Sequence, residues 1–317
     1  MLRLESLAAK PRAFVSLTGL TPAEFEALYG TFAPAYQRRR VAADTTRRGR
    51  QPRRRAPGAG HPHALDLRHR LLLALAWLKV YPTFEVLGLL FGLDKGNARR
   101  NLLEALEVLE GLDDFPFDRD PRGRPARPRS VEAVMEAFPA VRLVIDSKEQ
   151  RVYRPGGPHE RQKPYYSGKK KAHTLKTQLA VAPDGLIEAL SADVPGSVND
   201  VRLPRESGLL GRLAEGEAAL TDKGYEGAGK GVAVVVLMPK KNRKRNPCTE
   251  EDKARNRLIA RYRIVVEHTI AQLNRFTVLR QVYRGRRARH SQVVRVVAVL
   301  ANRRIRVTPL KRYGTAA

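Results

Sequence analysis

The chain has 317 residues, and its 42% hydrophobic content is enough for a substantial core, so one large domain with a smaller one is expected. Its 60 Lys and Arg against 32 Asp and Glu give a net charge of +28, which favours a polyanionic partner such as nucleic acid. One cysteine, Cys248, excludes an internal disulfide and disfavours a cysteine-based zinc site, and the absence of a membrane span or a clear signal peptide predicts a cytoplasmic protein.

The first predicted element is a short helix within residues 14–36. Thr21 and Glu24, with Pro22 between them, form a capping signal at its start. An Arg-rich linker follows at about 38–62, where Arg38 to Arg55 contain nine arginines and a single acid. Such a run can follow a phosphate backbone, with binding that weakens steeply as salt rises.

Three further helices are predicted in residues 65–77, 83–91 and 95–103, the last with Asp94 as its N-cap. The turn at Gly92 between the second and third of these helices is typical of a helix-turn-helix, although a plain helical bundle with a basic face fits equally well. In the first interpretation, the side chains that enter a DNA groove are Lys95, Asn97, Arg99 and Arg100. We therefore predict a helical domain at 1–115 and a linker at 116–139.

The pattern changes at residue 140. Predicted strands cover 141–145, 152–154, 173–181, 186–192, a segment that ends at Asp222, and 232–237. Predicted helices cover 200–213, 250–275 and 290–305. This order predicts a mixed sheet flanked by helices over 140–310. The segment from Gly224 to Lys230 nearly spells a phosphate-binding loop, but Gly231 stands where Ser or Thr is needed, so we reject a nucleotide site.

Three acids are candidates for chemistry. Asp146 directly follows the apolar run 141–145, Asp222 follows another, and Glu267 lies on a predicted helix four residues after Arg263. A lone buried carboxylate costs several kcal/mol unless it is paired or binds a cation. Taken singly, each acid has an ordinary explanation, as a turn residue or as the partner of Arg263. Together with the strand order, they favour a magnesium site built from carboxylates.

Several phrases in order carry a family resemblance: VIDSKEQRV, YYSGKKKAHTLK, PGSVND, TDKGYEG and RIVVEHTIAQLNRF. They span about 140–305 and resemble the DDE transposases with an RNase H-like core, with the insertion-sequence 5 group and its Harbinger-like relatives as the nearest likeness. The resemblance implies an RNase H-like mixed five-stranded sheet with flanking helices, preceded by an all-α helix-turn-helix domain.

The resemblance also implies roles for residues. Asp146, Asp222 and Glu267 become a catalytic triad that binds two Mg²⁺ ions, replaceable by Mn²⁺, at about 3.5–4 Å from each other. Where such transposases often carry Lys seven residues after the glutamate, this chain has Asn274 with Arg275 beside it. The expected DNA-backbone contacts of this domain are Lys169, Lys170, Lys171, Lys176, Arg263 and Arg275. Asp200 is read as a helix N-cap or a group near the metals, outside the triad.

The predicted function is a DNA transposase that binds the ends of an insertion element and performs metal-dependent strand cleavage and strand transfer. Its expected partner is double-stranded DNA, bound by a homodimer in the nucleoid. Two alternatives remain: an RNase H-like nuclease without joining activity, and a non-enzymatic basic DNA-binding protein.

Overall fold

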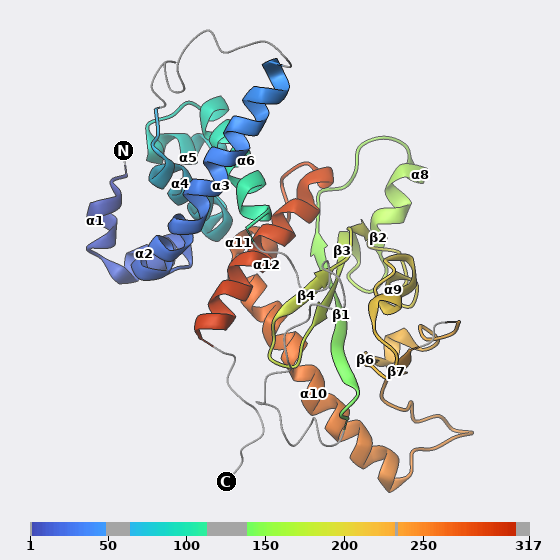
Figure 1. Ribbon diagram of the computed structural model, residues 1–317. Helices are drawn as coiled ribbons and strands as arrows, with labels where there is room; N and C mark the ends of the chain where they lie inside the picture. The colour runs from blue at the N-terminus through green and yellow to red at the C-terminus, as the bar shows by residue number, and fades with distance from the viewer. Residues whose placement is uncertain (1, 49–63, 113–137, 232–233, 309–317) are drawn as a thin grey trace. The chain divides into compact units, whose positions relative to one another are not determined.

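The structure is a computed structural model that describes residues 2–48, 64–112, 138–231 and 234–308 (Figure 1). The chain forms two compact units. The helical unit contains Met1–Asp113 and Arg275–Arg280, and the sheet unit contains Asp114–Asn274 and Gln281–Ala317. The predicted linker at 116–139 lies almost wholly outside the described residues.

The described part of the helical unit contains α1 (Leu4–Ala8), α2 (Pro11–Thr18), α3 (Pro22–Arg48), α4 (Leu67–Val80), α5 (Phe84–Phe91), α6 (Lys95–Glu110) and α11 (Thr277–Arg280). Side-chain caps explain where several of these helices begin. Thr21 and Glu24 form the reciprocal capping box, with N···O distances of 2.7 and 3.2 Å. Asp66, Thr83 and Asp94 each accept a hydrogen bond from the backbone N–H three residues later. The predicted helix starts are therefore confirmed.

The Arg-rich linker predicted at 38–62 is wrong in its first part, because α3 continues to Arg48. Positions 35–48 contain no proline or glycine, and arginine and alanine favour helix. Arg39 also pairs with Glu107 of α6 at 2.5 Å, which holds this extension beside the unit. Most of the remainder, 49–62, lies outside the described residues.

Helices α5 and α6 form the predicted pair joined by a short turn. Gly92 ends α5 in the left-handed conformation, with φ of 65°. The turn folds back closely, since Leu93 N donates to Gly88 O at 2.9 Å. A Cβ atom added at Gly88 would lie 2.4 Å from Leu93 O. Position 88 therefore accepts only glycine if this turn is to keep its shape.

We expect Gly88→Ala to destabilise the helical unit by about 1–3 kcal/mol, because the methyl group forces the backbone of the turn to move. Trp77 is the only tryptophan and is buried in α4, so its fluorescence during urea unfolding reports on this unit. The matched control is Gly30→Ala in α3, where an added Cβ has no neighbour within 4 Å. That change should leave stability equal or raise it by about 0.5–1 kcal/mol. Equal losses in both variants would contradict the close approach at Gly88.

The described part of the sheet unit contains strands β1 (Val141–Arg151), β2 (Tyr166–Ser167), β3 (Ala172–Val181), β4 (Ile187–Leu190), β5 (Val194–Pro195), β6 (Ala218–Leu220) and β7 (Val235–Leu237). Its α-helices are α8 (His159–Gln162), α9 (Leu203–Glu206), α10 (Glu250–Asn274) and α12 (His290–Val307), and its 3₁₀ turns are η3 (Lys163–Tyr165), η4 (Leu210–Arg212), η5 (Lys223–Tyr225) and η6 (Arg287–Arg289).

The five strands of three or more residues are ordered β4-β3-β1-β6-β7, and the two-residue strands β2 and β5 also pair with β3. β1 is antiparallel to β3 but parallel to β6, which is parallel to β7. This is a mixed sheet with an RNase H-like arrangement, so the predicted fold class is confirmed. No helix in the described part of the chain is long and apolar enough to cross a bilayer.

The two faces of the sheet are covered by different elements (Figure 1). Side chains alternate along β1, so Leu143 and Ile145 share one face, where they join a core with Leu210 of η4. On the other face, α10 and α12 are tied to the β3–β4 hairpin. Thr269 Oγ1 donates to Gly185 O at 2.8 Å, and the Asn302 amide makes two 2.9 Å hydrogen bonds with the backbone of β4.

Two predicted elements differ from the structure. The strand predicted at 141–145 continues to Arg151, because its polar second half stays paired with β3, and the separate strand at 152–154 is absent. The helix predicted at 200–213 is reduced to α9 and η4, since Gly208 between them takes a left-handed φ of 66°. The predicted strands at 173–181 and 186–192 and both long C-terminal helices are confirmed, within a few residues at their ends.

Candidate active site

Strand register places two of the predicted acids at the point where the pairing of β1 with β6 ends. In the parallel pair β1–β6, Val144 lies opposite Leu220. Asp146 lies two residues after Val144, and Asp222 lies two residues after Leu220. The two aspartates are therefore at the same level along the direction of the strands. Because β1 and β6 run parallel and side by side in this register, residues 76 positions apart in sequence become neighbours.

Asp146 lies on the face of β1 that is covered by α10. Its Oδ1 accepts a hydrogen bond from Ser147 N at 2.7 Å. Burial raises the pKa of Asp146 above its ordinary value, and the nearby charges of Asp222 and Asp200 raise it further, whereas the Ser147 N–H and Arg263 oppose the shift. Several negative charges therefore converge at this point, where a bound cation would relieve their repulsion.

Arg263 of α10 provides a positive charge between the two aspartates. Its guanidinium nitrogens lie 3.5 Å from Asp146 Oδ2 and 3.9 Å from Asp222 Oδ1. The Arg263 side chain is 16% exposed and that of Asp222 45% exposed, so the pair opens to solvent on the Asp222 side. A positively charged side chain thus lies between carboxylate oxygens of β1 and of the turn that follows β6.

Glu267 lies on α10 one turn after Arg263, on the same helix face. Its side chain is exposed. Among the described residues, no three His, Cys, Asp or Glu side chains lie close enough together to hold a metal ion. The structure therefore gathers Asp146 and Asp222 around Arg263 but does not bring the Glu267 carboxylate into contact with them.

The donor chemistry at this position suits a divalent metal such as Mg²⁺, which prefers oxygen ligands and keeps part of its water shell. Asp146 and Asp222 supply carboxylate oxygens on either side of one cation position, and Glu267 is the next acid along the neighbouring helix face. The guanidinium already occupying that position shows that positive charge is stabilised there. Two of the three predicted ligands, Asp146 and Asp222, are thus of the right chemistry for a divalent metal, while Glu267 lies apart from them in this structure.

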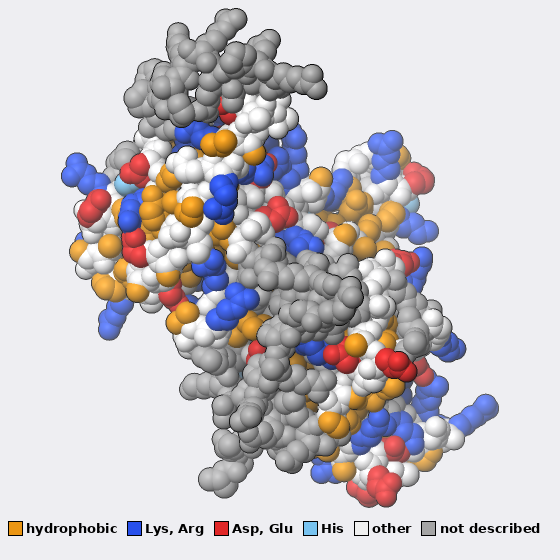
Figure 2. Space-filling view, in the orientation of Figure 1, with side chains coloured by type: hydrophobic (Ala, Val, Ile, Leu, Met, Phe, Trp, Pro, Cys, Tyr) orange, Lys and Arg blue, Asp and Glu red, His pale blue; other side chains and the backbone are white. Residues whose placement is uncertain are grey.

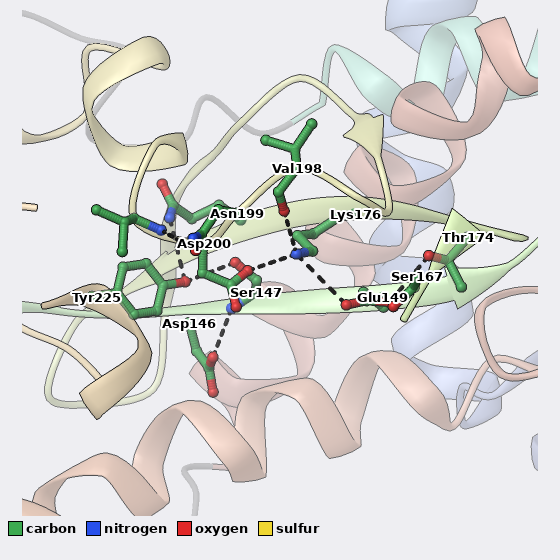
Figure 3. A network of polar contacts seen from close by, with 12 residues as sticks. Asp146, Ser147, Glu149, Ser167, Thr174, Lys176, Val198, Asn199, Asp200 and Tyr225 are labelled. Atoms are coloured by element: carbon green, nitrogen blue, oxygen red, sulfur yellow. Dashed lines mark hydrogen bonds and ion pairs between the residues drawn. The ribbon is translucent and has the colours of Figure 1, made fainter. Parts of the chain in front are cut away.

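On the opposite face of the sheet, a buried hydrogen-bond network links Ser147, the residue after Asp146, to Tyr225 (Figure 3). The hydroxyls of Ser147 and Tyr225 are 2.7 Å apart, and Gln178 Nε2 donates to the same phenol oxygen at 3.4 Å. Tyr225 is 1% exposed, and burial raises the pKa of its phenol. The network joins the neighbour of Asp146 to the turn that Asp222 caps. Sequence patterns did not identify it; the tyrosine of TDKGYEG was the available signal.

Lys176 belongs to this face and not to a DNA-contacting surface. Only 4% exposed, it donates to Val198 O at 2.7 Å and lies 2.9 Å from Asp200 Oδ1 and 3.6 Å from Glu149 Oε1 (Figure 3). Its ammonium group is neutralised inside the protein, so the predicted contact of Lys176 with DNA is contradicted by its burial. Asp200 pairs with this lysine instead of capping a helix, because α9 begins only at Leu203.

The three predicted lysines between β2 and β3 are accessible, in contrast to Lys176. Lys169, Lys170 and Lys171 form the exposed turn between β2 and β3. Burial, together with the charge of Lys170, lowers the pKa of nearby Lys148 to about 8. On the face drawn in Figure 2, Lys and Arg side chains are spread over the described surface with fewer acids among them.

In the helical unit, Lys95, Asn97, Arg99 and Arg100 all lie in the first two turns of α6. The lysine and both arginines are exposed. Lys95 pairs with Glu85 at 2.5 Å, and Asn97 Oδ1 accepts from Arg100 at 2.7 Å. Arg275 also belongs to this unit, where its backbone oxygen accepts from Lys79 Nζ at 2.7 Å. The predicted basic contacts are thus divided between both units.

A mixed sheet of this order, with one aspartate within the central strand β1 and a second just beyond the end of its parallel neighbour β6, defines an RNase H-like domain with an acidic site. Residues 145–302 match the family model described as DDE superfamily endonuclease. The chain is also 28% identical, over 243 residues, to the probable transposase for insertion sequence element IS702 of Microchaete diplosiphon; the match covers 77% of this chain and 82% of that relative. The chain therefore carries a DDE superfamily endonuclease domain and is similar to an insertion-sequence transposase. Its place in the insertion-sequence 5 and Harbinger-like group stays a prediction.

Proposed function

We propose that this protein is a DNA transposase that binds the ends of an insertion element, cleaves DNA strands there and joins them to target DNA. The observation that carries the proposal is the convergence of Asp146 and Asp222 on the guanidinium of Arg263, where the pairing of β1 with β6 ends. The family match and the transposase relative support the same reading. DNA as substrate suits the net charge of +28 and predicts action at the nucleoid.

In this proposal, Asp146, Asp222 and Glu267 hold divalent metal, two Mg²⁺ ions by preference, with Mn²⁺ as a substitute. Bound metal would activate the attacking oxygen and stabilise the leaving oxygen in displacement at phosphorus. Arg263 compensates the aspartates when metal is absent and is placed to contact a DNA phosphate once it moves aside. Ser147 and Tyr225 keep the two aspartates in register.

The DNA-contacting residues are divided by task. The exposed side chains at the start of α6 would enter a groove, and the exposed turn Lys169–Lys171 would hold the backbone near the acidic site. Arg275 adds a backbone contact in the helical unit. We propose a homodimer on DNA because two element ends must be brought together for joining.

The deciding experiment separates the transposase from a nuclease without joining activity. A DNA fragment that ends in the inverted repeat flanking the gene, pre-cut to expose its 3′-hydroxyl, is incubated with the protein, Mg²⁺ and a supercoiled target plasmid. We expect the labelled end to become covalently joined to the plasmid. Nicking without joining would favour the nuclease, and binding without either would favour the non-enzymatic alternative.

A further inference from the structure

A pocket of about 750 Å³ lies in the sheet unit, between the β3–β5 edge of the sheet and the segment that leads into α12. Its walls include Tyr165, Leu175, Pro195, Arg286, Arg287 and Ser291. None of these residues belongs to the proposed acidic site. The volume lies within the range of roughly 300–1,000 Å³ that is usual for sites that enclose one small ligand.

One wall of the pocket is a stacked pair. The guanidinium carbon of Arg287 lies 4.8 Å from the centroid of the Tyr165 ring. Leu175 and Pro195 add apolar surface beside this pair. Unpaired nucleobases bind such combinations, because their flat faces stack on aromatic rings and on guanidinium planes. The lining therefore suits a planar aromatic group.

The mouth of the pocket is positively charged. Arg286 and Arg287 are exposed, and neither has a carboxylate partner in the part of the chain that the structure describes. The acid in the lining, Asp193, is 9% exposed and engaged on its inner side: Thr177 Oγ1 donates to its Oδ1 at 2.5 Å, and His290 Nδ1 lies 2.7 Å from its Oδ2. The free charges of the rim are thus cations, which suit a phosphate.

The pocket shares a sheet face with the acidic site. Asp146 lies opposite Leu179 on β3, and Leu175 lies four residues further along the same strand and on the same face. Four residues of strand span about 13 Å. That distance corresponds to about four nucleotide steps of a B-form strand. A DNA strand held at Asp146 can therefore reach the pocket.

We propose that this pocket holds one unpaired nucleotide of the DNA substrate, with its base against the Tyr165–Arg287 wall and its phosphate at Arg286. The pocket volume of about 750 Å³ suits a single nucleotide and not a duplex. The proposal rests on the proposed function for the identity of the ligand, but it assigns a base-binding site that takes no part in metal binding or bond cleavage.

Its test is a binding measurement on the full chain in EDTA, where no cleavage occurs. The probes are a short fluorescein-labelled oligothymidylate and a strand of the same length made of abasic sites, which keeps the phosphates and lacks the bases. We expect the wild type to bind the thymidylate strand about ten-fold more tightly. Tyr165→Ala should remove this preference while binding to the abasic strand persists, because the charges remain.

Arg286→Ala should instead weaken both strands alike and reduce the slope of log affinity against log salt by about 1. Tyr153→Ala is the control for the tyrosine change, because Tyr153 is an exposed tyrosine of the same unit outside the pocket. A wild type that binds both probes equally, or a Tyr165→Ala variant that keeps the preference, would overturn the proposal. Either result leaves the cleavage and joining assays untouched, so failure here is distinguishable from failure of the proposed function.

Discussion

Asp146→Asn is expected to reduce Mg²⁺-dependent DNA cleavage by at least about 10²–10³-fold while leaving DNA binding unchanged. The amide keeps the size of the carboxylate and can still accept the hydrogen bond from Ser147 N. It removes the negative charge that makes the cation position between Asp146 and Asp222, where Arg263 now lies at 3.5 and 3.9 Å. Cleavage is measured as nicking of supercoiled plasmid, and binding as fluorescence anisotropy in EDTA.

Glu251→Gln is the matched control for this variant. It also removes one negative charge, from an exposed side chain in the first turn of α10, so it raises the net charge equally without touching the site. It should cleave at the wild-type rate. An Asp146→Asn variant that cleaves as well as Glu251→Gln would be incompatible with a catalytic role for the acidic site. Glu267→Gln, measured in parallel, tests whether the acid that lies apart here joins the site in the working complex.

Lys176→Met is expected to destabilise the sheet unit by about 3–5 kcal/mol. Methionine preserves most of the side-chain volume but leaves Glu149, which is 9% exposed, and Asp200, which is 30% exposed, without the ammonium group between them. Breaking a buried ion pair from one side costs more than the pair contributes, because the remaining charge stays desolvated. Thermal unfolding followed by circular dichroism measures the loss, since Trp77 reports on the other unit.

Lys253→Met supplies the comparison for a solvent-exposed pair. Lys253 and Glu250 are 2.7 Å apart, with side chains 53% and 81% exposed, so its loss should cost less than about 1 kcal/mol. The double variant Lys176→Met with Glu149→Gln should recover part of the stability, because it also removes the stranded acid. If Lys176→Met and Lys253→Met lose the same amount of stability, the predicted contribution of the buried Lys176 ion pairs to the stability of the sheet unit is wrong.

Local chemistry explains which parts of the fold could be predicted. Helix starts could be predicted at Thr21, Asp66 and Asp94, because each side chain accepts a hydrogen bond from a backbone N–H only three residues later. This interaction depends on the local sequence alone. The run at 141–145 predicts a strand through another local property, since β-branched apolar residues such as Val144 and Ile145 favour buried strands. The extension of β1 to Arg151 could not be read in this way, since its polar residues are held by pairing with β3, which lies far along the chain.

The site shows the same division. Asp146 and Asp222 could be named because each follows an apolar run and because the ordered phrases resemble one family. The burial of Lys176 could not be predicted, because the sequence around a lysine in a strand does not tell whether its side chain faces solvent or two acids. The position of Arg263 between the aspartates could not be predicted either, because it depends on how α10 packs on the sheet.

The segment Arg275–Arg280 directly follows α10, yet it belongs to the helical unit. Phe276 is 5% exposed, and its ring lies 3.2 Å from where a Cβ of Gly19 would stand. The helical unit is therefore built from two segments that are separate in sequence, and the two units do not simply follow one another along the chain. A truncated protein cut near residue 113 would lack this second segment, so an exchange of helical units between relatives would need three crossover points in the gene, near residue 113 and on either side of 275–280, rather than one.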